Sequence, residues 1–250
     1  MEAPEHRRLE EAALSAWPAL QQIVYDGWLL RFAGGFTKRA NSVNALYPST
    51  LCLDHKISRC EVVYAARDLP IIFRMTPHSH PDGLDERLDQ RGYRIIDRTL
   101  VMVGSLNAQA DELKSPFETR IVSLLEWLDV YARLRAPAVE QLALLRGIVT
   151  KIPTSLCPVL GFRGGNLMGY GLGVLDSELV GIFGLYVVPA VRRSGLGKTM
   201  LRRIFQWAGM RGAKQGYLQV EADNAPAIRL YQGIGWSESY PYWYRVQENH

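Results

Sequence analysis

An apolar run that stops at a proline and continues as a basic, glycine-containing segment constrains this chain more than any other feature. Residues 183–188 are all apolar or glycine, as in a fully buried strand, and Pro189 ends the run. Apolar residues then recur at helical spacing over 196–210. The start of a helix offers free backbone N–H groups and a partial positive charge, which suit a pyrophosphate. The residues between strand and helix are Arg192, Arg193, Ser194, Gly195, Leu196, Gly197 and Lys198.

Spacing excludes two common phosphate-binding motifs. A P-loop needs a glycine five residues before its Gly-Lys-Thr, and Arg192 occupies that position here. A dinucleotide-binding fingerprint needs a third glycine where Met200 stands. What remains is Arg-x-x-Gly-x-Gly after a proline-terminated strand. An ordinary strand-to-helix turn with basic residues facing water is the alternative.

The remaining pattern resembles motif A of the GCN5-related N-acetyltransferase (GNAT) family, in which this loop and helix start hold the pyrophosphate of acetyl-coenzyme A. The resemblance implies an α/β fold with a mixed, mostly antiparallel sheet flanked by helices. It assigns the following residues to the cofactor: Tyr186, Val187, Val188, Arg192, Arg193, Ser194, Gly195, Leu196, Gly197, Lys198, Asn224 and Tyr231.

A second segment, residues 217–236, resembles motif B of the same family. It predicts a strand over 217–220, a polar corner, a helix from about Pro226 and an exit through Gly235. Asn224 and Tyr231 are seven residues apart and share one helix face. The resemblance implies that Asn224 seats the pantetheine arm and that Tyr231 protonates the departing thiolate. A helix cap and a core tyrosine are the structural alternatives.

Acyl transfer from a thioester to an amine needs a polarised carbonyl, a stabilised thiolate and a neutral amine. A backbone N–H near Val187 or Val188 is expected to polarise the carbonyl. The strand over 179–186 carries no carboxylate, so the general base is not assignable from the family pattern. Glu221, after the following strand, is the best candidate, with Glu178 and Tyr186 behind it. A solvated loop carboxylate is the alternative for Glu221.

Composition limits the other classes of protein. The chain has 250 residues, is 48% hydrophobic, and contains neither a membrane-length apolar run nor a secretory h-region. Three cysteines without Cys-x-x-Cys spacing predict reduced, buried thiols in a cytoplasmic protein. His78 and His80 lie between prolines without a third ligand, so we expect no metal.

The net charge of +4 and the pI near 9.0 raise the question of nucleic acid. The basic residues gather around 192–203, where the phosphate-loop interpretation already needs cations, and no aromatic residues are interleaved with them. We therefore expect an anionic cosubstrate, no nucleic acid and no membrane partner. A homo-oligomer is left open.

Residues 116–250 carry the elements of the family domain in order. Strands are predicted at 116–122, 156–162 and 168–175, and helices at 124–134 and 139–148, ahead of the two motifs. The resemblance therefore places a catalytic domain at 116–250.

Residues 1–115 echo the second half of that domain. Predicted strands fall at 27–32, 42–47, 71–75, 93–97 and 99–103, and predicted helices at 54–66 and 84–91. When Pro48 is aligned with Pro189, and Gly92 with Gly235, residues 1–115 carry none of the predicted cofactor residues at the aligned positions. Leu51, Asp54, Lys56, Pro81 and Leu88 stand at the positions of Arg192, Gly195, Gly197, Asn224 and Tyr231. We interpret 1–115 as a degenerate GNAT-like domain in a tandem; chance similarity is the alternative.

The polar segment 34–42 lies between two predicted strands. It fits a solvated hairpin loop, or an acceptor-recognition loop in which Arg39 or Asn41 reaches the C-terminal site. Together these features predict transfer of an acetyl group from acetyl-coenzyme A to a primary amine, by direct attack on the thioester. The competing functions are a non-catalytic module that binds coenzyme A or uses the fold for interaction, and transfer of a longer acyl or aminoacyl group. The acceptor, a small-molecule or peptide amine, stays open.

Overall fold

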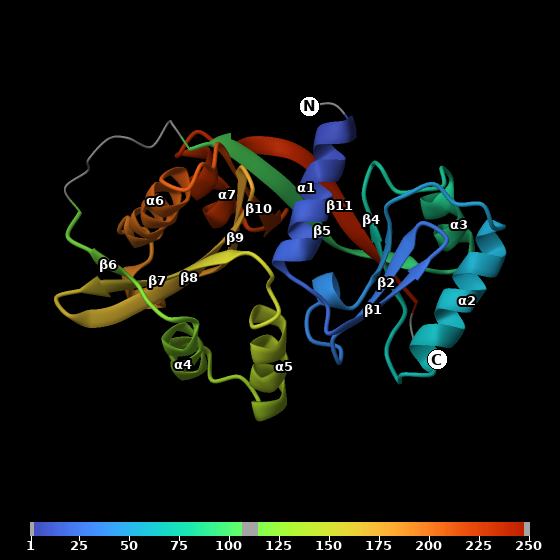
Figure 1. Ribbon diagram of the computed structural model, residues 1–250, viewed down its shortest axis with the longest axis horizontal. Coiled ribbons are helices and arrows are strands. Elements are labelled where there is room, and N and C mark those ends of the chain that lie inside the picture. Colours follow the sequence, from blue (N-terminus) through green and yellow to red (C-terminus); the bar gives the residue numbers. More distant parts are fainter. Residues whose placement is uncertain (1–2, 107–114, 248–250) are drawn as a thin grey trace.

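The computed structural model describes residues 3–106 and 115–247 (Figure 1). The described strands form one sheet in the order β1-β2-β3-β4-β11-β5-β10-β9-β8-β7-β6. Their bounds are β1 Gln21–Tyr25, β2 Trp28–Phe32, β3 Val43–Ala45, β4 Ile72–Met75, β5 Arg94–Ser105, β6 Glu118–Ile121, β7 Ser155–Arg163, β8 Asn166–Asp176, β9 Leu179–Val187, β10 Gln215–Glu221 and β11 Ser237–Val246. The helices are α1 Ala3–Ala16, α2 Leu53–Ala65, α3 Leu84–Gln90, α4 Leu124–Arg135, α5 Val139–Val149, α6 Leu196–Gly209 and α7 Ala225–Gln232, with short 3₁₀ turns η1 Lys38–Ala40 and η3 Pro189–Val191.

The two halves of the chain exchange their last strands at the centre of the sheet. β3 pairs with β4 in parallel, as β9 does with β10, and all the other pairs are antiparallel. Each parallel pair is followed by a helix and a final strand. The final strand of the first half, β5, lies between β10 and β11, while that of the second half, β11, pairs with β4. The repeat order matches the predicted echo; the division into 1–115 and 116–250 stays a prediction, and the sheet continues across it.

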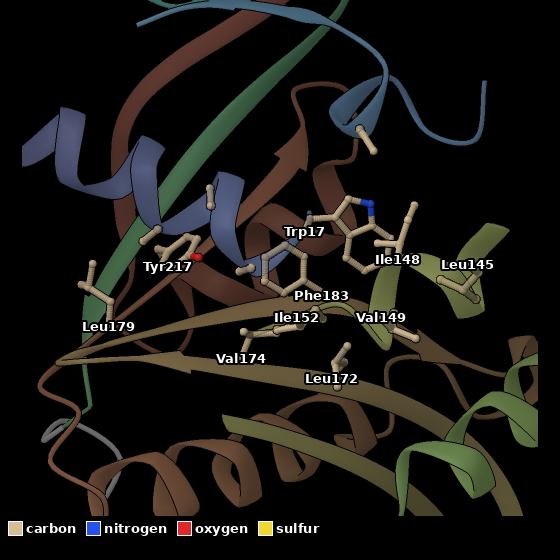
Figure 2. Packing of buried hydrophobic residues seen from close by; sticks show 14 of the residues in the cluster. Trp17, Leu145, Ile148, Val149, Ile152, Leu172, Val174, Leu179, Phe183 and Tyr217 are labelled. Atoms are coloured by element: carbon tan, nitrogen blue, oxygen red, sulfur yellow. The ribbon is translucent and has the colours of Figure 1, made fainter. Parts of the chain in front are cut away.

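Three apolar cores cover the two faces of the sheet. On one face, α1, α4 and α5 pack over the central strands. On the other, α6 and α7 cover the C-terminal strands while α2 and α3 cover the N-terminal strands, at opposite ends of the molecule (Figure 1). Figure 2 shows the first core, where Trp17, just after α1, lies against Phe183 of β9. These rings stack with centroids 5.6 Å apart.

Most of the predicted elements are present within a few residues of the expected bounds. Three were not predicted: α1, β1 and β11. The strands expected at 93–97 and 99–103 are one continuous strand, β5, in which Asp97 has a positive φ of 48°. None of the helices in the described ranges is both long and apolar enough to span a bilayer.

The expectation of three buried thiols is wrong for Cys52, which is exposed beside the start of α2. Cys60 and Cys157 are buried, and burial raises the pKa of each thiol to about 12. These two thiols therefore stay protonated and inert at neutral pH.

Candidate active site

The parallel strands β9 and β10 separate partway along their length. Their last paired residues are Ile182 and Leu218; beyond them β10 pairs only with β5, and β9 only with β8. A bulge shifts the register of β9 against β8 after Phe183, where Gly184 has a φ of +54°. The resulting opening holds a cavity of about 450 Å³. Its lining residues are Thr37, Lys38, Arg39, Asp97, Thr99, Ile182, Gly184, Leu185, Leu218, Gln219, Val220, Glu221, Asn224, Ala227, Tyr231, Tyr242 and Tyr244.

The predicted phosphate loop leads into α6. Gly195 is the residue before the helix and has a φ of +99°, a conformation that favours glycine. Within the described ranges, the backbone N–H groups of residues 193–198 donate no hydrogen bond to the protein. Arg192 donates to the Val187 carbonyl at 3.2 Å, whereas the side chains of Arg193 and Lys198 have no partner among the described residues. The loop thus presents unpaired N–H groups and cations.

Gly197 and Ser194 have more local roles in this loop. A Cβ on Gly197 would lie 3.3 Å from Leu230 Cδ2, so a small residue lets α6 approach α7 closely. The Ser194 hydroxyl donates to the Val191 carbonyl and holds the turn. Leu196 is buried in the core beneath α6.

Of the two predicted backbone donors, the N–H groups of Val187 and Val188, only one is free of a partner on β8. The Val188 N–H donates to the Met168 carbonyl at 2.9 Å, so it is not free to polarise a substrate carbonyl. Hydrogen-bonded and non-hydrogen-bonded pairs alternate in antiparallel strands, and Val187 is paired with Gly169 next to that bonded pair. The Val187 N–H therefore points away from β8, toward the opening between β9 and β10.

Asn224 and Tyr231 both line the cavity from α7. Asn224 caps the helix by accepting a hydrogen bond from the Ala227 N–H at 3.2 Å, which leaves its amide NH₂ free. Tyr231 is buried, its ring stacks on Trp236, and its hydroxyl has no hydrogen-bond partner among the described residues. Burial raises the pKa of Tyr231 to about 12, so the hydroxyl is a proton donor at every physiological pH.

The three candidate bases lie in different places. Glu221 ends β10 and lines the cavity, and no described cation pairs with it. Glu178 lies at the far end of β9, where it pairs with Lys214 and Arg8, and these neighbours lower its pKa. The expectation that Glu178 could serve as a base is therefore wrong. Tyr186 does not line the cavity; its ring stacks on Tyr170 at 5.3 Å on the opposite face from α6.

The loop at 33–41 connects the first half to this cavity, but through Arg39 and not Asn41. Arg39 donates its Nε to Gln219 Oε1 on β10 at 2.7 Å and lines the cavity. Asn41 is buried and uses its whole amide on the loop itself. It accepts from the Ala33 and Gly35 N–H groups and donates to the Phe36 and Thr37 carbonyls. The expectation that Asn41 reaches the site is wrong.

The polar residues that line the cavity beside Arg39 were not predicted from the sequence. Tyr242 of β11 donates its hydroxyl to Gln219 Oε1 at 3.1 Å, and Thr99 of β5 lies opposite both Glu221 and Tyr242. A usable signal was present, because tyrosines at 240, 242 and 244 alternate as one face of a strand does. Gln219 had no such signal.

The N-terminal half contains a counterpart of the α6 start that is already filled. The Asp26 carboxylate accepts hydrogen bonds from the backbone N–H groups of Thr50 and Leu51, just before α2. The buried Lys56 ammonium lies 3.2 Å from the same carboxylate. Counted from the first residues of the two helices, Leu53 and Leu196, the N–H groups of Thr50 and Leu51 correspond to those of Arg193 and Ser194, which are unpaired among the described residues. An internal anion thus occupies the equivalent position in the first half.

A parallel strand pair that opens beside a glycine-bounded helix start, within a mixed sheet flanked by helices, defines the GNAT fold. The structure of a GCN5-related N-acetyltransferase from Kribbella flavida shares this fold, with a TM-score of 0.75 and 16% identity over 98% of this chain and 96% of that one. A tandem GNAT protein from the clavulanic acid biosynthesis pathway superposes with a TM-score of 0.61 and 12% identity, over 79% of this chain and 70% of that one.

The chain belongs to the family described as "Probable histone acetyltransferase Rv0428c C-terminal", whose model matches residues 3–245. It is also 27% identical to the "Uncharacterized N-acetyltransferase YobR" of Bacillus subtilis (strain 168), over 96% of this chain and 98% of that protein. These matches and the fold make the chain an N-acetyltransferase of the GNAT family.

Proposed function

We propose that the chain transfers an acetyl group from acetyl-coenzyme A to a primary amine by direct attack on the thioester. The observation that carries the proposal is the opening between β9 and β10. Tyr231 lines this opening with an unpartnered hydroxyl, and the register of β9 directs the Val187 N–H away from β8. Val187 and the unpaired N–H groups at the start of α6 lie beyond the residues that line the cavity itself. Together they match the charges that acyl transfer creates.

The residues fit acetyl-coenzyme A on chemical grounds. Backbone N–H groups at 193–198, with Arg193 and Lys198, would hold the pyrophosphate, as helix starts do for anions. The free amide NH₂ of Asn224 would bind a carbonyl of the pantetheine arm. When bound, the cosubstrate supplies an activated acetyl group as a thioester.

Val187, Glu221 and Tyr231 each have one role in the transfer of the acetyl group. The Val187 N–H donates to the carbonyl oxygen as it becomes negative. Glu221 takes a proton from the amine, directly or through water, as the new N–C bond forms. Tyr231 gives its proton to the thiolate as the C–S bond breaks, and water then returns a proton to Tyr231 and removes the one on Glu221.

Thiol release from acetyl-coenzyme A in the presence of a panel of primary amines tests this function. We expect saturable release that depends on an amine, together with binding of acetyl-coenzyme A by calorimetry. Thermal stabilisation by acetyl-coenzyme A without turnover on any amine would instead indicate a non-catalytic coenzyme A-binding module. Faster release from longer acyl thioesters would indicate a different donor.

A further inference from the structure

Two of the charged side chains that line the cavity form no ion pair with another described residue. Four charged residues line it: Lys38, Arg39, Asp97 and Glu221. Lys38 Nζ and Asp97 Oδ2 are 2.8 Å apart and neutralise each other. Arg39 and Glu221 have no oppositely charged partner among the described residues. One unpaired cation and one unpaired anion thus share the cavity.

Arg39 is held firmly although it has no carboxylate partner. Its Nε donates to Gln219 Oε1 at 2.7 Å, and its guanidinium lies 5.6 Å from the Phe183 ring centroid and 5.9 Å from that of Trp17. Its backbone carbonyl accepts a 2.9 Å hydrogen bond from the buried Arg31. The two terminal nitrogens of Arg39 have no partner among the described residues. A fixed guanidinium with both terminal nitrogens free matches the two oxygens of a carboxylate.

Arg39 and Glu221 lie on the face of the sheet opposite the phosphate loop. Successive side chains of a strand alternate between faces, and Tyr217 of β10 packs in the core beneath α1. Gln219 and Glu221 share that face with Tyr217, whereas Tyr231 and α6 pack on the other face. Glu221 is two residues beyond Gln219, about 7 Å along the strand. A molecule entering from the α1 face therefore meets Arg39 and Glu221 before it reaches Tyr231.

We propose that the acceptor is an amine that also carries a carboxylate, an amino acid or a closely similar zwitterion. Arg39 binds the carboxylate, and Glu221 faces the neutral amino group, from which it takes a proton as the new N–C bond forms. This inference rests on the proposed function, because it describes the acceptor side of the same cavity. Arg39 forms no bond with the reacting atoms and determines specificity.

The test compares amino acids with their carboxamides as acceptors: glycine, β-alanine, γ-aminobutyrate, phenylalanine and lysine, each against its amide. Removing the negative charge loses a charge-assisted bidentate contact, so we expect acids to exceed amides by ~10- to 100-fold in kcat/KM for the acids that fit. Arg39→Gln should erase this preference through KM for the acid, with the affinity for acetyl-coenzyme A unchanged. Arg39→Lys should retain part of the preference for acids, because lysine keeps the positive charge but lacks the two parallel N–H donors of the guanidinium.

Arg211→Gln is the matched control, because Arg211 also stacks on a tryptophan, at 4.7 Å from the Trp207 ring, but lies outside the cavity. It should preserve the preference for acids. Equal use of acids and amides by the wild-type enzyme would overturn the inference while leaving the transferase intact. So would an Arg39→Gln variant that loses both acceptor types equally, because that loss would indicate a structural role.

A second readout separates failure of this inference from failure of the proposed function. If acetyl-coenzyme A binds and no compound is acetylated, calorimetry with each acid and its amide decides. Carboxylate binding that Arg39→Gln abolishes would support the anion site and refute the transfer to amines. Binding without preference for the acid would refute the anion site.

Discussion

The Asp26 carboxylate accepts a 2.9 Å hydrogen bond from the backbone N–H of Leu51, just before helix α2. It also accepts from the N–H and the hydroxyl of Thr50. When the two helices are aligned at their first residues, the equivalent N–H groups before α6 are those of Arg193 and Ser194, and these have no partner among the described residues. The first helix start is therefore satisfied by a side chain of its own half, and we expect one acetyl-coenzyme A per chain.

Asp26→Asn should lower the free energy of unfolding at pH 7, because the uncharged amide is a weaker acceptor and leaves Lys56 without its counter-charge. Hydrogen bonds from Leu51 and Thr50 hold the pKa of Asp26 well below its usual range. A carboxyl whose pKa is lowered by folding stabilises the protein above its unfolded pKa, and loses this contribution as the pH falls through the folded value. Urea unfolding should thus show a difference between wild type and variant that shrinks below about pH 4. Asp129→Asn, exposed on α4, should show no such convergence.

Gly195→Ala should weaken binding of acetyl-coenzyme A by ~10-fold, because the loop would give up a φ of +99° that presents its N–H groups. A Cβ at this position meets nothing within 4 Å, so the cost is backbone strain of about 1–2 kcal/mol and not a clash. Gly212→Ala is a close control, since Gly212 has a φ of +90° and equally open surroundings away from the cavity. It should lower the melting temperature similarly and leave calorimetric binding unchanged. Equal loss of binding in both variants would contradict the role of the loop.

Tyr231→Phe should lower kcat by ~100-fold and change the affinity for acetyl-coenzyme A much less, because only the proton donor is removed. Since burial raises the pKa of Tyr231 to about 12, the wild-type rate should show no loss from tyrosine ionisation below pH 11. Tyr47→Phe, which removes an exposed hydroxyl bonded to Glu11, should be neutral. An unchanged kcat in Tyr231→Phe would exclude this residue from the mechanism.

Glu221→Gln should lower kcat for amine acetylation by ~100-fold at neutral pH. Raising the pH should recover part of the loss, because more of the amine is then neutral without help from a base. Rates measured between pH 6 and 10 with one amine provide the check. Glu118→Gln, on the exposed edge strand β6, is the control. A variant with the wild-type pH profile would mean that another group or water takes the proton.

Residues 1–115 and 116–250, expressed separately, should each fail to give a folded protein. The second fragment lacks β5, which hydrogen-bonds to both β10 and β11, and the first lacks β11 beside β4. Co-expression should restore a soluble complex in which both fragments are recovered together. Circular dichroism and amide dispersion in NMR spectra report on folding. A stably folded 116–250 fragment would show that β5 is dispensable.

Local sequence chemistry was enough to predict the strand end, the helix start and the helix cap that lie beside the cavity. Pro189 and Gly195 fix where β9 ends and α6 begins, and Asn224 caps α7 as its type suggests. Each of these residues lies within a few positions of the strand end or helix start that it determines. The acceptor side depends on pairs far apart in sequence, such as Arg39 with Gln219, and no spacing rule distinguishes Arg39 from Asn41.

The missed elements have weak local patterns. The inner stripe of α1 is rich in small residues, Ala12, Ala13 and Ala16, so its apolar signal is slight. In β11 the tyrosines alternate, but Pro241 lies between two of them, and a proline normally argues against a central strand. The exchange of β5 and β11 has no local signature, because it is set by pairing between strands far apart in the sequence.

The exchanged strands also limit how such a chain can evolve. β5 of the first half hydrogen-bonds to both β10 and β11 of the second half. Deleting the first half would therefore leave the edges of β10 and β11 unpaired. The first half can therefore keep a helix start that is satisfied by its own Asp26, but it cannot be discarded as a unit. Its persistence needs no second catalytic centre to explain it.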